Sequence, residues 1–94
     1  MANAWYQSVC HHCLRYYARH PKPGAFPDEG SRHRWEACSR AVTKEDADVI
    51  ALFAQTNTKA AIYDYARKNR IPEGEVWSKV RDLKRRVAGE LGII

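Results

Sequence analysis

Three cysteines and a histidine at metal-ligand spacing constrain the first half of this chain more than any other feature. Two residues separate Cys10 from Cys13; after nineteen more residues comes His33, five positions before Cys38. A C-x2-C pair is the usual way to place two thiolates on one zinc ion, and three cysteines with one histidine complete a closed tetrahedral set. The spacing therefore predicts a structural Zn²⁺ bound by Cys10, Cys13, His33 and Cys38.

A metal ion would also order the segment that joins these ligands. The stretch "ARHPKPGAFPDEGSRHR" holds three of the four prolines and two of the five glycines, a composition typical of loops and turns. Metal binding would supply folding free energy that a loop-rich module lacks. Other interpretations stay open. Cys10 and Cys13 could be a redox pair, the cysteines could be small buried residues, and the fourth ligand could be His11, His12 or His20.

From residue 43 onward the pattern changes to that of helices. Thr43 followed three residues later by Asp46 resembles a capping box. We expect a first helix from there, with an apolar stripe on Ala47, Ile50 and Ala54 that Val49 and Phe53 widen. A second helix is expected at about 59–68, with Ile62, Tyr65 and Ala66 on one face. Asn69, which tolerates the left-handed conformation, and Pro72 then mark a break.

The third expected helix, at about 72–88, has the clearest periodicity. Its apolar residues fall within a narrow arc at about 100° per residue; they are Val76, Val80, Leu83, Val87 and Leu91. Ser78, Arg81, Asp82 and Arg85 occupy the opposite face. This pattern predicts an amphipathic helix that packs through one side.

Charge favours a polyanionic partner. The chain has 16 Lys and Arg against 11 Asp and Glu, a net charge of +5, and "RDLKRRV" places four of the positive charges within seven residues. Nucleic acid is the first candidate and an acidic protein surface the second. Aromatic residues interleave with Arg15, Arg19, Arg32 and Arg34 and could either stack on single-stranded nucleic acid or fill a small interior; they are Trp5, Tyr6, Tyr16, Tyr17 and Trp35.

The segments "TKEDADVIALFA" and "AAIYDYARKNRIPEGEVWSKVRDLKRRV" resemble three-helix helix-turn-helix domains of the Myb/SANT and sigma-factor region 4 type. Ala66 takes the small-residue position where two helices cross, and Ile71 packs under the turn. The resemblance implies that helix 72–88 enters a DNA major groove. Glu75, Ser78, Lys79 and Asp82 would then face the bases, with Arg81, Arg85 and Arg86 on phosphates. The sequence departs from the pattern at Glu73 and Glu75, which oppose phosphate, and at Asn69 and Arg70 in the turn.

Together these observations predict a mainly α protein with a loop-rich, zinc-stabilised module at 1–42 and a helix-turn-helix-like unit at 43–94. The expected function is a DNA-binding regulator, of a kind common among bacteriophage and mobile-element products. The expected nucleic-acid contacts are Ser78, Lys79, Arg81, Lys84, Arg85 and Arg86. The alternative is a protein-interaction module that binds and inhibits an acidic host enzyme or nucleoprotein complex.

Neither catalysis nor membrane insertion is expected. No Ser-His-Asp set, carboxylate pair or phosphate-binding loop is recognisable, and no apolar run approaches the roughly 18 residues of a membrane span. The N-terminus lacks the features of a secretory signal, so we expect a cytoplasmic protein. The sequence makes no prediction about oligomeric state.

Overall fold

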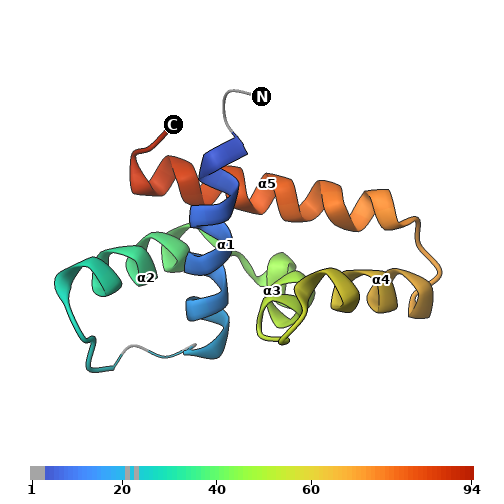
Figure 1. Ribbon diagram of the computed structural model, residues 1–94, viewed down its shortest axis with the longest axis horizontal. Coiled ribbons are helices and arrows are strands. Elements are labelled where there is room, and N and C mark those ends of the chain that lie inside the picture. Colours follow the sequence, from blue (N-terminus) through green and yellow to red (C-terminus); the bar gives the residue numbers. More distant parts are fainter. Residues whose placement is uncertain (1–3, 21, 23) are drawn as a thin grey trace.

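The computed structural model describes residues 4–20, 22 and 24–94. Within these residues the chain forms helices joined by short connections, with no strand (Figure 1). The elements are α1 (Ala4–Arg19), α2 (Glu29–Ala41), the 3-10 turn η1 (Lys44–Asp46), α3 (Ala47–Phe53), α4 (Thr58–Lys68) and α5 (Glu73–Leu91). The expected mainly α class is confirmed.

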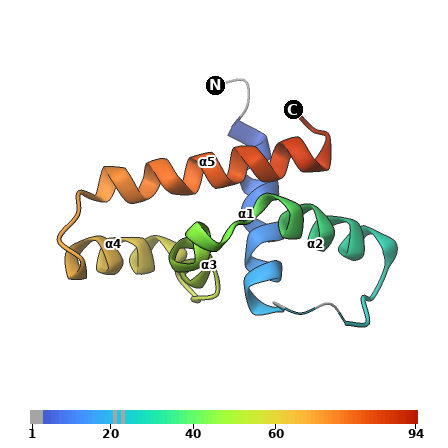
Figure 2. The same cartoon turned by 180° about the vertical axis from the view of Figure 1, so that it is seen from behind.

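Helix α5 runs along one side of α2, α3 and α4, and α1 crosses it (Figures 1 and 2). α1 and α2 contact its C-terminal half, whereas α3 and α4 lie against the half nearer its N-terminus (Figures 1 and 2). α4 and α5 lie side by side and run in opposite directions. The first two helices and the last therefore meet, although more than thirty residues separate α2 from α5 in the sequence.

The expectation of a loop-rich N-terminal module is wrong for the described residues. α1 starts at Ala4 and continues through both cysteines of the C-x2-C pair, and α2 covers 29–41. The reason is visible once cysteine is counted as apolar: Tyr6, Cys10, Cys13 and Tyr17 then recur at helical spacing. Asp28 begins α2, because its Oδ1 accepts from the Ser31 backbone N–H at 2.7 Å.

The second half agrees with expectation in its helices and differs in detail. α4 and α5 lie close to the expected ranges, and Val76, Val80, Leu83 and Val87 are buried. In α3 the buried residues are Val49, Leu52 and Phe53, whereas the expected stripe residue Ala47 is exposed. The helix ends at Phe53, so its core-facing side is set by only seven residues.

The break between α4 and α5 is made by a different residue from the one expected. Arg70, with φ of 56°, adopts the left-handed conformation, whereas Asn69 has φ of −95°. The Asn69 side chain instead donates to the Tyr65 carbonyl at 2.8 Å. The Tyr65 carbonyl also accepts from the Asn69 backbone N–H at 3.0 Å, so both donors of Asn69 hold the end of α4.

One cluster of buried residues holds the helices together. It includes Cys10, Leu14 and Cys38 from the first half together with Phe53, Ile62, Val76, Val80, Leu83 and Val87 from the second. Leu14 and Phe53 are completely buried. The expected boundary at residues 42 and 43 therefore crosses a shared core. Among the described helices, none is long and apolar enough to cross a bilayer.

Candidate functional site

The three cysteines gather in the core between α1 and α2. Cys10 and Cys38 are fully buried and Cys13 nearly so, and all three are free thiols. Burial raises the pKa of Cys10 to about 11, and burial with the neighbouring Cys13 raises that of Cys38 to about 12. Burial also raises the pKa of Cys13, which the Arg34 guanidinium partly offsets. These thiols are protonated at neutral pH.

The structure does not bring His33 to these thiols. His33 is exposed on α2, and five residues along a helix place it about 140° around the axis from Cys38. His11 stacks near Phe53, with ring centroids 5.4 Å apart, and His12 lies toward the surface. Within the described residues, no group of three or more His, Cys, Asp or Glu side chains is placed to hold a metal ion. A structural Zn²⁺ bound by Cys10, Cys13, His33 and Cys38 therefore stays a prediction.

Three of the six expected nucleic-acid contacts on α5 are buried or form ion pairs within the protein. Lys84 is buried, with Nζ 6.0 Å from the centroid of the Phe53 ring, and burial lowers its pKa. Arg86 forms an ion pair with Asp46 at 2.9 Å. Arg85 pairs with Asp82 at 3.0 Å. The other three expected contacts, Ser78, Lys79 and Arg81, are exposed.

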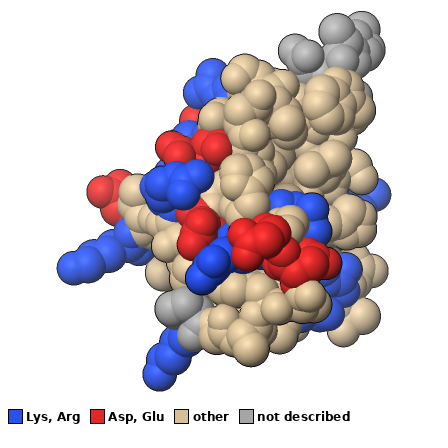
Figure 3. Space-filling view, turned by 90° about the vertical axis from the view of Figure 1, so that its left-hand side faces the viewer, with Lys and Arg blue, Asp and Glu red and all other residues tan. Residues whose placement is uncertain are grey.

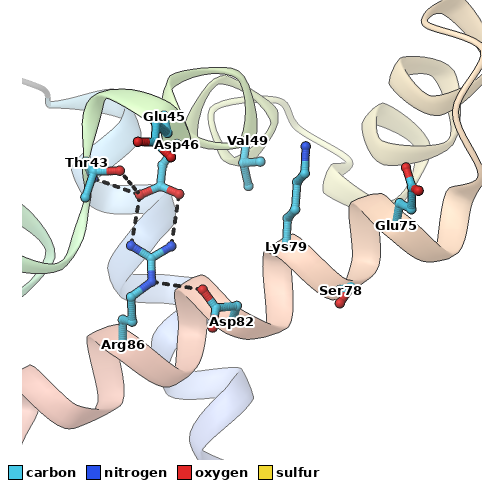
Figure 4. Close-up of a pocket in the computed structure, with 9 residues that line it drawn as sticks. All are labelled: Thr43, Glu45, Asp46, Val49, Glu75, Ser78, Lys79, Asp82 and Arg86. Carbon is cyan, nitrogen blue, oxygen red and sulfur yellow. Dashed lines mark hydrogen bonds and ion pairs between the residues drawn. The ribbon is translucent and has the colours of Figure 1, made fainter.

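A groove separates the first half of α5 from η1 and α3 (Figure 4). Its volume is about 840 Å³, and it carries four carboxylates, from Glu45, Asp46, Glu75 and Asp82. Against these it presents only Lys79 and Arg86, and Arg86 is already hydrogen-bonded to Asp46 and Asp82. Lys79 extends from α5 into the space beside Val49. The groove is therefore of mixed charge, which makes it a poor surface for phosphate.

The side of the molecule formed by α2 and the end of α5 is also balanced in charge. Figure 3 shows basic and acidic side chains next to one another across this side. Arg32 lies 3.6 Å from Glu29 and 3.9 Å from Glu36, and Arg40 lies 2.7 Å from Glu90. These neighbouring carboxylates partly neutralise Arg32 and Arg40, so that both are less available to nucleic acid.

α1 differs from every other surface helix because no carboxylate lies near it in the sequence. Residues 1–27 contain no Asp or Glu. Helical spacing places Trp5, Val9, His12, Tyr16 and Arg19 along one outer side of α1, and Trp5 is 55% exposed. We call this set, together with Ser31 and Arg34 of α2, the α1 face. The face combines aromatic and basic side chains without an acidic residue.

The interleaved aromatic residues divide into two groups. Trp35 is buried, its ring lies 5.4 Å from that of Tyr17, and its Nε1 donates to the His20 carbonyl at 2.6 Å. These two residues fill the interior. Trp5 and Tyr16 remain on the α1 face, where the half-buried Tyr16 ring lies tilted against that of His20, with centroids 4.6 Å apart. Packing thus accounts for part of the aromatic set, and Trp5 is the member left exposed for binding.

A hollow of about 430 Å³ opens between α1 and α2 within the α1 face. It is lined by Val9, His12, Cys13, Tyr16, Ser31 and Arg34. Arg34 is exposed and forms no direct ion pair with a described carboxylate, although Asp28 lies near enough for the Arg34 charge to help lower the Asp28 pKa. The expectation of a loop-rich module at 1–42 hid this face, although Trp5, Val9, His12 and Tyr16 follow helical spacing.

Comparison with protein-family models, curated proteins and solved structures found no match for this chain.

Proposed function

We propose that this protein is a non-catalytic nucleic-acid-binding regulator that contacts single-stranded DNA or RNA through the α1 face. The observation that carries the proposal is the coincidence of exposed Trp5 and half-buried Tyr16 with Arg19 and Arg34, which form no ion pair with a described carboxylate, on a face whose α1 residues include no carboxylate. Because the chain is basic overall, its long-range field would also attract a polyanion.

The chemistry of the face suits a single strand better than a duplex. Bases of a single strand are free to stack on aromatic rings, each stacked base contributing about 1–3 kcal/mol, and this stacking tolerates any sequence. Trp5 and Tyr16 lie eleven residues apart, about 16 Å along the helix axis, a length that a few nucleotides span. The arginines would contact phosphates and release counterions.

α5 contributes less to this proposal than the sequence indicated. Glu73, Glu75 and Asp82 lie among the exposed cations Lys79 and Arg81. Like charges near phosphate weaken binding, and a strand laid along α5 would meet carboxylates at both ends of the helix and at Asp82 near its middle. Reading of a major groove by α5 therefore stays a prediction, to be compared directly with binding by the α1 face.

The test is fluorescence anisotropy of a labelled oligothymidine, of a matched oligouridine and of a duplex, at low and near-physiological salt. Arg34→Glu is compared with Arg81→Glu, so that the same charge reversal is made on the α1 face and on α5. Trp5→Ala is compared with Tyr63→Ala, because Tyr63 is an aromatic residue of similar exposure on α4.

We expect wild-type protein to bind single strands with a steep salt dependence, and Arg34→Glu to weaken binding and flatten the salt slope by about one phosphate contact. Trp5→Ala should cost about 1–3 kcal/mol of binding free energy, and Tyr63→Ala should cost nothing. Stronger effects of Arg81→Glu than of Arg34→Glu would place the interface on α5. Absence of binding at low salt would reject a nucleic-acid function.

A protein-interaction module that inhibits another protein or complex is the second candidate. The groove in Figure 4 favours it, because Val49, Glu75 and Lys79 offer apolar contact and both signs of charge, as interfaces between proteins do. A photo-crosslinker at Ser78, beside the groove, would capture such a partner. Capture that persists with nucleic acid in excess would support this candidate over the first.

A further inference from the structure

The hollow between α1 and α2 is the part of the α1 face that has the size of a ligand site. Its volume of about 430 Å³ lies within the range of about 300–1,000 Å³ that is typical of small-molecule sites. Val9 and the nearly buried Cys13 give it apolar surface. The hollow therefore has room for a flat ring that leaves the solvent.

Two rings from α1 line the hollow. His12 and Tyr16 are four residues apart, a spacing that puts both side chains on the same side of a helix. The Tyr16 ring lies against that of His20, with centroids 4.6 Å apart. The His12 ring lies against that of His11, with centroids 5.8 Å apart. Because rings that are already held lose little conformational freedom when a ligand binds, this lining favours stacking of a flat aromatic ligand.

The charge of the hollow favours an anion beside that ring. Arg34 Nη1 and Nη2 lie 3.4 and 3.6 Å from the position that a Cβ of Gly30 would take, so the guanidinium lies over the first turn of α2. None of the described residues that line the hollow is acidic, whereas the groove in Figure 4 carries four carboxylates. Asp28 is close enough to interact with the charge of Arg34 but does not line the hollow. An aromatic ring joined to an anion is the chemistry of a nucleotide.

We propose that the hollow accepts one base of a bound single strand, with the base against Tyr16 and His12 and the adjoining phosphate at Arg34. The inference rests on the proposed function, because it assigns the place of one nucleotide on the α1 face. Modest base preferences of single-strand binders come partly from stacking strength. A purine has the larger ring surface, so a strand that contains one purine among pyrimidines should place it in the hollow.

The first experiment compares two labelled strands of equal length by fluorescence anisotropy at low salt. One is oligothymidine, and the other is the same strand with a single central adenine. We expect wild-type protein to bind the strand with adenine several-fold more tightly than oligothymidine. We call this ratio of affinities the adenine advantage.

Matched substitutions test whether the adenine advantage arises in the hollow. Val9 lines the hollow and is 39% exposed, so Val9→Trp fills the hollow from its edge. Ser8 is exposed, precedes Val9 on α1 and does not line the hollow. Val9→Trp should abolish the adenine advantage, and Ser8→Trp should retain it. Both variants add the same ring to α1, so a general gain in stacking is controlled for.

A photoreactive purine locates the base directly. The strand is prepared with 8-azidoadenine in place of the central adenine, irradiated with the folded wild-type protein and analysed by peptide mapping. Attachment is expected within residues 9–16 or 31–34, which hold the lining of the hollow. Attachment confined to Trp5 or to α5 would overturn the proposal.

The outcomes separate this proposal from the proposed function. Equal affinity of wild-type protein for the two strands, or an adenine advantage that Val9→Trp and Ser8→Trp change equally, would overturn the hollow as a base site. Either result would leave the α1 face as an interface without base preference. Absence of binding to both strands at low salt would reject the proposed function and this proposal together. Circular dichroism of every variant ensures that the folded state is being compared.

Discussion

Asp46 shows how one side chain can serve both local and long-range structure. Its carboxylate accepts from the Thr43 backbone N–H at 2.8 Å, which closes the first turn of η1. The same carboxylate binds the Arg86 guanidinium through contacts of 2.9 and 3.0 Å. The local contact is predictable from the Thr43–Asp46 spacing. The contact with Arg86 is not, because the partners lie forty positions apart in the sequence.

Replacing Asp46 by Asn should lower the free energy of unfolding at neutral pH by about 1–2 kcal/mol, because a charge-assisted pair that is partly screened by solvent is lost. Urea denaturation measures the change. Glu45→Gln is the matched control, since Glu45 is exposed and adjacent. If Glu45→Gln were destabilised as much as Asp46→Asn, the stabilisation could not be assigned to the pair of Asp46 with Arg86.

The same pair predicts a pH dependence. The hydrogen bond from Arg86 is the main cause that lowers the pKa of Asp46. The stabilisation is therefore complete above the pKa of an unfolded aspartate, about 3.9, and is lost as the pH falls through the lowered folded-state pKa. The stability difference between wild type and Asp46→Asn should narrow in that acidic range. A difference that is constant with pH would exclude this origin.

Lys84 adds to the net positive charge of the chain but contributes little to the charge of its surface. Its ammonium group is nearly buried near Phe53 and Cys10, and burial lowers its pKa. Because replacing a buried charge by an apolar side chain of similar volume is often stabilising, Lys84→Met should raise stability by about 1 kcal/mol, measured by thermal denaturation. It should leave nucleic-acid affinity unchanged. A weaker nucleic-acid affinity of Lys84→Met would indicate that Lys84 belongs to the nucleic-acid interface.

At the scale of elements, the sequence predicts α5 well and α1 poorly for one physical reason. The stripe of Val76, Val80, Leu83 and Val87 has no interpretation other than packing, so α5 is readily recognised. Cys10 and Cys13 have two interpretations, as metal ligands and as small apolar residues. Only when they are counted as apolar residues does the helical pattern extend α1 back to Ala4. The candidate site depends on that helix, because Trp5 and Tyr16 share a face only if the residues between them are helical.

The two glycines near the end of α5 should respond in opposite directions to alanine. Gly89 is helical and has open space around its Cα, so Gly89→Ala should stabilise by about 0.5–1 kcal/mol. Gly92 ends the helix with φ of 76°, where a side chain is strained. Gly92→Ala should therefore destabilise. Chemical denaturation measures the change in the free energy of unfolding for each variant. A change of the same sign in both would contradict a helix that ends at Gly92.

At the scale of the whole molecule, α5 joins both halves. It contacts α1 and α2 through its second half and α3 and α4 elsewhere, and the buried cluster is continuous across all of them. Such an arrangement depends on contacts between distant residues. The periodicity of each helix predicts which side is buried, but not which helix covers it, so the shared core was beyond prediction from the sequence.

A shared core predicts cooperative unfolding. Leu14 is fully buried on α1, and Leu14→Ala should cost about 2–5 kcal/mol. The loss should appear as a single transition at lower temperature, in which circular dichroism of the helices and tryptophan fluorescence change together. Residual helical signal from an intact α5 after the fluorescence change would instead indicate two independently folding halves.

The dependence of α1 on α5 has a consequence for synthesis of the chain. A ribosome produces α1 and α2 well before the residues of α5 exist, so the sides of these helices that α5 will cover emerge without their partner. During that interval Leu14 and the three thiols lack their native surroundings. The nascent chain is thus open to chaperones and to oxidants until α5 has been made and has left the ribosome, because only then can α5 cover these sides of α1 and α2.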